Sequence, residues 1–466
     1  MKNLALLSLL LVSAPQAADD RPNILFAIAD DWAWPHAGVY GDTVVKTPTF
    51  DRVAKDGILF SHAYCASPSC TPSRAAILTG QHIHRLEESG NLWSLLTPKF
   101  DTYPDLLEKQ GYAVGLWGKG WGPGDFKAGG RERNPAGPNV KSFPEFLKTV
   151  PKDKPFCFWF GHRDPHRAYE KGQGVKSGLK IEDVLVPPYL PDTPEVRSDL
   201  LDYYFAVQRF DRDLGQALEA LEASGRAANT LVIVTGDNGM PFPRCKANCY
   251  DSGTRQPLAV RWPMKVKAGR TSDAFIGLVD VAPTVLEAAG QKIPASMSAR
   301  SFLDILRGEP ATSRDRILLE RERHANVRQG DMSYPVRGLR NRQYAYLRNL
   351  RPELWPAGDP EKWKAVGSYG DCDGGPSKDQ IIARRDQDLA KFFRIAFEKR
   401  PARELYDIVK DPYQLENIAE KHPDVVEKMD AELIQWLKET GDPRVVDGKL
   451  TGEDARWDKY PYFGHP

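Results

Sequence analysis

The chain carries four short runs of apolar residues in which polar positions do not alternate. Strands that are buried on both faces have this pattern, because neither face needs polar side chains. Charged or amide side chains follow each run. The runs are Asn23–Ala29, Tyr112–Trp117, Phe156–Phe160 and Leu231–Val234.

Amphipathic segments lie between these runs, at Phe50–Asp56, Tyr103–Gln110 and Leu200–Ala223. Strands that alternate with such helices are typical of α/β folds with a parallel sheet. Open α/β sheets bind ligands beyond the carboxyl ends of their strands, which is where the polar side chains stand. The pattern therefore predicts an α/β domain with a largely parallel sheet and one site at its edge. The alternative is that each polar cluster is ordinary loop chemistry.

The pattern changes after residue 335. Arg337–Arg348 predicts a pair of strands with exposed basic faces, Leu405–Pro412 predicts a strand and turn, and Asp424–Glu439 predicts a helix. We therefore expect a main domain over residues 19–335 and a smaller α+β subdomain over residues 336–466.

The N-terminus has the features of a cleaved secretory signal. Lys2 supplies a positive charge, Leu4–Val12 is a short apolar run, and small residues follow near Ala17. We assign residues 1–18 to a signal peptide, with a buried N-terminal helix as the alternative. The junction has no cysteine for a lipid anchor, and no later run is long and apolar enough to cross a bilayer. The sequence predicts a periplasmic or secreted protein without a membrane anchor.

Composition and charge narrow the possible partners. The 466 residues are 41% hydrophobic, and 64 basic side chains nearly balance 63 acidic ones, so the formal charge is +1. Proteins that bind nucleic acid without sequence preference usually carry a basic excess. We therefore predict no nucleic-acid partner.

Two pairs of oxygen-donor residues follow two of the predicted strands. Asp30-Asp31 and Asp237-Asn238 supply carboxylate and amide oxygens, which suit Ca²⁺ or Mg²⁺. Adjacent carboxylates repel each other unless a positive charge lies between them. Each pair taken alone is also compatible with a helix cap or a turn. Together they predict a site for a hard cation.

Several basic residues are candidates for the same site. Each taken alone is compatible with a solvated or structural side chain. Combined with a hard cation, they predict a site for a tetrahedral oxyanion, either sulfate or phosphate. These residues are Arg74, Lys119, His166, Lys246 and Arg255.

Cys70 stands just before a predicted helix. Pro72 suits a first helical position, and Ala75–Leu78 are good helix formers. Cys70 would then lie at a helix N-terminus, where backbone N–H groups favour an anion. A disulfide with Cys65 and a zinc site with His62 are the alternatives, and neither accounts for the Pro-Ser-Arg that follows. The pairing of the six cysteines stays open.

The segment Cys70-Thr-Pro-Ser-Arg74, followed by Leu78-Thr-Gly80, resembles the C-x-P-S-R…T-G signature of type I sulfatases. The resemblance implies an alkaline-phosphatase-like α/β fold. It also implies that a formylglycine-generating enzyme converts Cys70 to Cα-formylglycine. A Ca²⁺ site is implied as well, and its ligands would be residue 70 and the two oxygen-donor pairs, namely Cys70, Asp30, Asp31, Asp237 and Asn238.

Other motifs extend the resemblance. Lys119 matches the lysine of the family's G-K motif, and His166 matches the histidine of its D-P-H motif. Lys246 precedes Gly253-Thr-Arg255-Gln-Pro257, which is similar to the family's G-x-R-x-P element. The resemblance implies that a hydroxyl of the aldehyde hydrate attacks sulfur while Arg74, Lys119 and Lys246 hold the sulfate oxygens. His166 or Lys246 would protonate the leaving group.

Four segments resemble one branch of the family, the N-sulfoglucosamine sulfohydrolase-like sulfatases. The resemblance implies a sulfated sugar or polysaccharide, such as a glycosaminoglycan, as substrate. Trp121 stands where many sulfatases have a histidine, so the choice between N-sulfate and O-sulfate stays open. The four segments are Asp164–Arg167, Val186–Pro194, Asp237–Pro243 and Met332–Arg337.

We take Arg255, His84 and Arg328 as candidate sugar-binding residues, with His324 as a further candidate for the sugar pocket. Two other functions remain as alternatives. One is a phosphate or phosphonate ester hydrolase of the same superfamily, which would share the metal site. The other is a non-catalytic protein that binds sulfated glycans and never converts Cys70.

Overall fold

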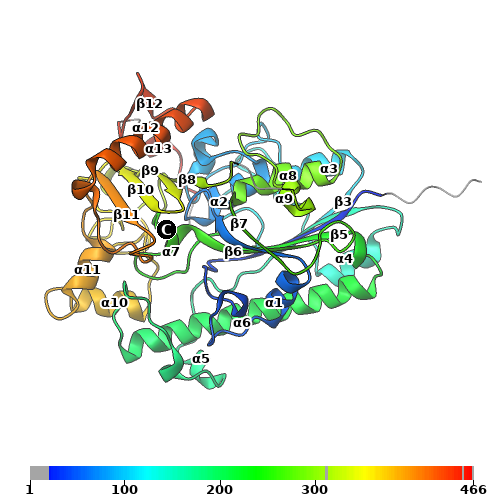
Figure 1. Ribbon diagram of the computed structural model, residues 1–466, viewed down its shortest axis with the longest axis horizontal. Helices are drawn as coiled ribbons and strands as arrows, with labels where there is room; N and C mark the ends of the chain where they lie inside the picture. The colour runs from blue at the N-terminus through cyan, green and yellow to red at the C-terminus, as the bar shows by residue number, and fades with distance from the viewer. Residues whose placement is uncertain (1–19, 310–312, 454–455, 464–466) are drawn as a thin grey trace, which may run out of the picture.

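The computed structural model describes residues 20–309, 313–453 and 456–463 (Figure 1). The predicted signal peptide, residues 1–18, lies outside the described residues. Within the described ranges, no helix combines the length and the apolar character needed to cross a membrane.

The larger sheet has seven strands in the order β3-β4-β1-β5-β6-β2-β7. Strands β3, β4, β1 and β5 run parallel to one another, β6 is antiparallel to both of its neighbours, and β2 is parallel to β7. The prediction of a largely parallel sheet is confirmed. The bounds are β1 (Asn23–Ala29), β2 (Ile58–Tyr64), β3 (Ala113–Gly118), β4 (Phe156–Gly161), β5 (Thr230–Gly236), β6 (Arg255–Arg261) and β7 (Arg270–Gly277).

Strand β1 shows why the apolar runs have no polar positions. Ile24, Phe26 and Ile28 belong to the hydrophobic core on one face of the sheet, whereas Leu25 and Ala27 belong to the core on the other. All seven residues of the strand are buried. Both faces therefore need apolar side chains, as expected for strands covered by helices on both sides.

Helices cover the two faces of this sheet. The 30-residue α6 runs along one face together with α1 and α4, and α2, α3, α8 and α9 lie on the other (Figure 1). The bounds are α1 (Pro48–Lys55), α2 (Cys70–Thr79), α3 (Tyr103–Lys109), α4 (Phe143–Thr149), α5 (Gln173–Lys176), α6 (Pro194–Ala223), α7 (Asp251–Thr254), α8 (Val281–Ala288) and α9 (Leu303–Arg307).

A smaller antiparallel sheet, β11-β10-β9-β8, forms the C-terminal part. Helix α12 packs on it (Figure 1). The first strand of this sheet along the chain, β8, comes before the domain boundary expected after residue 335. The bounds are β8 (Arg316–Arg321), β9 (Val336–Asn341), β10 (Tyr344–Asn349), β11 (Arg403–Asp407), β12 (Val445–Val446), β13 (Lys449–Leu450), α10 (Pro376–Ala383), α11 (Ala390–Phe397), α12 (Pro423–Thr440) and α13 (Arg456–Lys459).

The basic residues of β9 are not exposed, so that part of the prediction is wrong. Arg337 and Arg340 are both buried. Arg337 pairs with Asp442 and Glu322, each at 2.6 Å, and Arg340 contacts Asp251 at 3.0 Å. Buried carboxylate partners make these positions tolerable for guanidinium groups.

Candidate active site

The two oxygen-donor pairs meet because β1 and β5 are parallel neighbours. Ala29 lies opposite Gly236, so the residues that follow each strand leave the sheet side by side. The backbone N–H of Asp31 donates to Asp237 Oδ1 at 2.9 Å, and the Asn238 amide donates to Asp31 Oδ1 at 2.7 Å. Asp30, Asp31, Asp237 and Asn238 are all buried. The sequence prediction that these residues converge holds in their geometry.

Asp31 adopts a backbone conformation with φ of 70°. Non-glycine residues rarely adopt this left-handed region, although aspartate is among the more tolerant. The turn directs consecutive carboxylates, Asp30 and Asp31, to the same place, where both approach Cys70. Local strain of this kind is common where function fixes the backbone.

Cys70 is the first residue of α2, and Ser69 precedes it in an extended conformation. The Cys70 Sγ lies 3.4 Å from Asp30 Oδ1 and 3.9 Å from Asp31 Oδ1. Burial raises the pKa of the Cys70 thiol well above its usual range, and Asp30 raises it further. The encoded thiol is therefore protonated and is a poor nucleophile as it stands.

Arg74 lies one turn further along α2 and is fully buried. Its Nε donates to Asp237 Oδ2 at 2.8 Å, and a terminal nitrogen lies 3.4 Å from Asp30 Oδ1. Another terminal nitrogen donates to the carbonyls of Lys119 and Gly120. Arg74 thus holds the side chains of Asp30 and Asp237 in position. It is not among the described residues that line the cavity.

Two lysines approach the carboxylates from different segments. Lys119 Nζ, just after β3, lies 2.7 Å and 2.6 Å from the two oxygens of Asp30. Lys246 Nζ lies 2.8 Å from Asp31 Oδ2 and 3.2 Å from Asp373 Oδ2. Burial lowers both lysine pKa values, but the neighbouring carboxylates outweigh it and raise them above the usual lysine value. Both lysines therefore stay charged at neutral pH.

His166 follows β4 and lines the same cavity. Its Nδ1 is hydrogen-bonded to the carbonyl of Arg167, and its Nε2 lies 3.9 Å from Asp31 Oδ2. Because a carbonyl only accepts, Nδ1 carries a proton and Nε2 is the nitrogen that can exchange one with a ligand.

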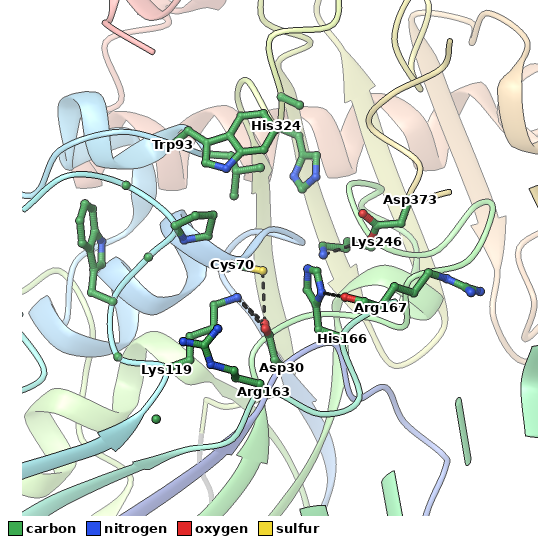
Figure 2. Close-up of a pocket in the computed structure, with 18 of the residues that line it drawn as sticks. Asp30, Cys70, Trp93, Lys119, Arg163, His166, Arg167, Lys246, His324 and Asp373 are labelled. Atoms are coloured by element: carbon green, nitrogen blue, oxygen red, sulfur yellow. Dashed lines mark hydrogen bonds and ion pairs between the residues drawn. The ribbon is translucent and has the colours of Figure 1, made fainter. Parts of the chain in front are cut away.

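A cavity of about 790 Å³ is lined by Asp30, Cys70, Lys119, His166 and Lys246. Figure 2 shows Cys70 between Lys119 on one side and Lys246 and His166 on the other. Other residues that line the cavity include Trp93, Trp121, Arg163, His324 and Asp373. An anion that enters the cavity meets the helix N-terminus and two ammonium groups.

Three candidate sugar-binding residues lie elsewhere and are not among the described residues that line this cavity. Arg255 stacks on Trp34 at 3.5 Å and donates to the Ser61 carbonyl. His84 contacts Glu320 at 2.8 Å, and Arg328 contacts Asp371 at 2.7 Å. Each is buried or half-buried in contacts within the protein.

The sequence did not predict Asp373 as a site residue, and His324 was only a further candidate for the sugar pocket. Asp373 precedes α10 in a Gly-rich turn, and His324 follows β8. His324 Nδ1 is hydrogen-bonded to Ser69 Oγ at 2.7 Å. Neither residue belongs to a motif, and both are polar residues in loops, so the sequence carries no local signal for them.

The six cysteines all lie in the described part of the chain and are free and buried. Cys65 approaches the Gly253 carbonyl, and His62 stacks on Phe275. The arrangement therefore contains neither the Cys65–Cys70 disulfide nor the zinc site with His62 that the sequence left open.

Comparisons of the sequence with known protein families and proteins find matches along most of the chain. Residues 22–291 match the family model described as Sulfatase, and residues 245–363 match the one described as N-sulphoglucosamine sulphohydrolase, C-terminal. The human N-sulphoglucosamine sulphohydrolase is 30% identical, with 92% of this chain and 93% of that protein covered. An ulvan-active sulfatase of Formosa agariphila is 28% identical, with coverage of 91% and 82%.

A solved structure has the same fold. It is a protein in complex with its substrate, D-glucosamine-2-N,6-O-disulfate. The superposition has a TM-score of 0.65 at 20% identity and covers 93% of this chain and 100% of that one. At this level of identity the likeness concerns the fold alone.

Proposed function

Since the chain belongs to the sulfatase family, we propose that it hydrolyses the sulfate ester or N-sulfate of a sulfated sugar, using Cys70 converted to Cα-formylglycine and a bound Ca²⁺. One observation carries the proposal. Cys70 stands at the N-terminus of α2, 3.4 Å from Asp30, inside a cavity lined by Lys119 and Lys246. The names of the relatives support a glycosaminoglycan-type or related polysaccharide substrate.

The residues present fit a calcium ion. Oxygen atoms of Asp30, Asp31 and Asp237 lie within 4.8 Å of one another and of the Cys70 sulfur. Asn238 Oδ1 is buried without a hydrogen-bond partner, as expected for an oxygen reserved for a cation. Three carboxylates and one amide are a hard, oxygen-rich donor set. Asp30, Asp31, Asp237 and Asn238 would hold the ion together with residue 70.

Burial raises the pKa of Asp237 to about 6, Arg74 opposes this rise, and Asp30 adds to it. Carboxylates packed this closely favour a positive charge among them. When bound, Ca²⁺ supplies that charge and polarises an oxygen at position 70. An aldehyde hydrate at position 70 would supply one hydroxyl to attack sulfur, while the bond from sulfur to the leaving oxygen or nitrogen breaks. Loss of the proton from the second hydroxyl would then release sulfate and restore the aldehyde.

In this proposal, Lys119 and Lys246 hold the sulfate. An ammonium group has three N–H donors, and Lys119 and Lys246 each contact carboxylate oxygens at two distances below 3.3 Å. Each ammonium lines the cavity and keeps donor capacity for a sulfate oxygen. Donors aimed at developing charge lower the barrier because they need no reorganisation.

His166 is placed to move a proton at the leaving atom. Its ring is oriented by the Arg167 carbonyl, and its Nε2 faces the carboxylate cluster at 3.9 Å from Asp31. Protonated His166 would donate from Nε2 to the leaving oxygen or nitrogen, and Lys246 is the alternative donor. Arg74 would contribute by fixing Asp30 and Asp237, since all three of its guanidinium nitrogens donate to groups within the protein.

Mass mapping tests the modification directly. Trypsin should release Asp56–Arg74, which contains both Cys65 and Cys70. Protein made together with a formylglycine-generating enzyme should yield a peptide with one alkylatable thiol and one aldehyde. Cys65 serves as an internal control, because it should alkylate in every preparation. Active protein in which both thiols persist would overturn the proposed nucleophile.

Activity separates this proposal from its alternatives. The modified protein should release sulfate from an aryl sulfate or from N-sulfoglucosamine, and Cys70→Ala should abolish the release. Faster cleavage of the paired aryl phosphate would indicate the phosphate ester hydrolase. Binding of sulfated glycan without turnover, and with the thiol intact, would indicate the non-catalytic protein.

Export is part of the proposal. Residues 1–18 would direct the chain to the periplasm or the medium and be removed. N-terminal sequencing of the exported protein should begin near Asp19. A mature protein that retains Met1 would contradict this assignment.

A further inference from the structure

Asp373 is a carboxylate in a cavity otherwise suited to anions. It lines the cavity, and its side chain is 27% exposed. The other acidic residues of the cavity wall are engaged elsewhere. Asp30 belongs to the candidate metal site, and Asp164 forms an ion pair with Arg209 at 2.6 Å. Asp373 is therefore the one acidic residue of the described cavity wall that neither belongs to the candidate metal site nor pairs with an arginine.

Lys246 satisfies only part of the hydrogen-bonding capacity of Asp373. Asp373 Oδ2 lies 3.2 Å from Lys246 Nζ, but the contact lacks hydrogen-bond geometry. Lys246 already contacts Asp31 at the shorter distance of 2.8 Å. Burial acts to raise the pKa of Asp373, but Lys246, His166 and His324 lower it to about 2, so the group is a carboxylate throughout the neutral range. It keeps unused capacity to accept hydrogen bonds.

The loop that carries Asp373 is held rigidly. Asp371, two residues earlier, accepts from Arg321 at 2.6 Å and Arg328 at 2.7 Å. Asp371 also accepts the backbone N–H of Ala325 at 2.8 Å, which fixes the segment that follows β8. Lys378 donates to the carbonyls of residues 369 and 372. A group held this firmly is preorganised for a ligand.

The contacts of Asp371 with Arg321, Arg328 and Ala325, which we call the Asp371 hub, also fix His324. His324 precedes Ala325, and its Nδ1 is hydrogen-bonded to Ser69, the residue before Cys70. In Figure 2, His324 and Asp373 lie on the side of Cys70 away from Lys119. A sulfated group at residue 70 would therefore have the rest of its molecule beside Asp373.

We propose that Asp373 is a specificity residue that accepts hydrogen bonds from hydroxyl or amino groups of the sugar ring carrying the scissile sulfate, with His324 beside it. This inference rests on the proposed function. A carboxylate repels a sulfate or a uronate at this position and accepts neutral or cationic donors. The pocket therefore selects a ring whose positions next to the sulfate are unsulfated and carry hydrogen-bond donors.

Two substrates separate this role from a structural one. N-sulfoglucosamine offers hydroxyl groups beside the sulfate, whereas 4-nitrophenyl sulfate offers none. For Asp373→Ala, kcat/KM on the sugar should fall by about 10- to 100-fold, as expected for a lost hydrogen bond to a charged group. On the aryl sulfate kcat/KM should fall less, because Lys246 keeps its contact with Asp31. Asp373→Asn should recover part of the loss, because it keeps one acceptor oxygen. Asp379→Asn, on the exposed face of α10, is the matched control.

If the wild type cleaves N-sulfoglucosamine but not the aryl sulfate, product inhibition distinguishes the same two roles of Asp373. Inhibition by glucosamine should weaken in the Asp373 variants, and inhibition by inorganic sulfate should not. Equal losses on both substrates or both inhibitors, or no loss on either, would overturn the role of Asp373. Failure of the proposed function would look different, because the modified wild type would then release no sulfate from either substrate.

Discussion

Replacing Lys246 with methionine removes an ammonium group that lies 2.8 Å from Asp31 and 3.2 Å from Asp373. Methionine keeps much of the length of the side chain but carries no charge and no donor. The change therefore tests two consequences of the proposed site at once. It removes a sulfate-holding donor, and it leaves two carboxylates without their shared cation.

The expected magnitudes differ for rate and stability. Loss of one preorganised donor to developing negative charge lowers kcat by about 10²- to 10³-fold. Removing one partner of a buried ion pair costs about 3–5 kcal/mol of unfolding free energy. Since Asp31 is also a proposed Ca²⁺ ligand, bound calcium should offset part of this stability loss but none of the rate loss.

The assay combines turnover of N-sulfoglucosamine with thermal unfolding in EDTA and in excess Ca²⁺. Lys246→Met should unfold at a lower temperature than the wild type in EDTA, and the difference should shrink in Ca²⁺. Lys246→Arg keeps the charge and should recover stability more than rate. Lys265→Met, at an exposed position, makes the same substitution as a control.

The dependence on pH follows from the direction of the pKa shift. Burial lowers the pKa of Lys246, but Asp31 and Asp373 raise it well above the usual lysine value. The stabilising contribution is complete below the unfolded pKa of about 10.4 and is lost only as pH rises through the higher folded value. The stability difference should therefore stay constant between about pH 6 and about pH 9. A tenfold or smaller fall in kcat, or a stability difference that ignores Ca²⁺, would refute the reasoning.

Three further outcomes are expected. Burial lowers the pKa of His84, but Glu320 at 2.8 Å raises it above the usual histidine value. This pair therefore stabilises the fold below about pH 6.5, and the stability is lost as pH rises through the folded pKa. The melting temperature of the wild type should approach that of His84→Gln over this rise, and a constant difference would contradict the prediction. Arg328→Met should destabilise the fold by about 3–5 kcal/mol, because Asp371 loses a partner, and unchanged stability would contradict this. It should also lower turnover of the sugar sulfate more than that of the aryl sulfate, because Asp371 holds the segments that carry His324 and Asp373. Chelation should lower both activity and melting temperature, Ca²⁺ should restore both, and unchanged melting would count against the metal site.

The sequence predicted the sulfate-handling end of the site because that end follows from local pattern and sheet geometry. A buried strand followed by paired carboxylates predicts where the carboxylates will lie once its neighbour is parallel. Asp30 and Asp237 meet for this reason, although about 200 residues separate them. The predicted helix start at Cys70 is likewise a local signal, and the structure begins α2 at that residue.

The remaining parts depend on contacts between distant segments. Arg337 looked exposed because β9 reads as a basic strand, and nothing nearby in sequence reveals Asp442 as its partner. Arg328 likewise looked free to bind a sugar, but Asp371 holds it inside the protein. Buried ion pairs of this kind are decided by tertiary packing, which the order of residues along one element does not reveal.

The site therefore draws its two tasks from two parts of the chain. The edge of the parallel sheet supplies Cys70, Asp30 and Lys119, which in the proposed function act on the sulfate group. The segments after β8 and before α10 supply His324 and Asp373, which face whatever carries the sulfate. The Asp371 hub joins these two segments without contributing to the cavity wall. Under the proposed function, changes in the C-terminal segments would alter sugar preference and leave Cys70 and the carboxylates in place, because the contacts of Asp371 rather than the sheet position these segments.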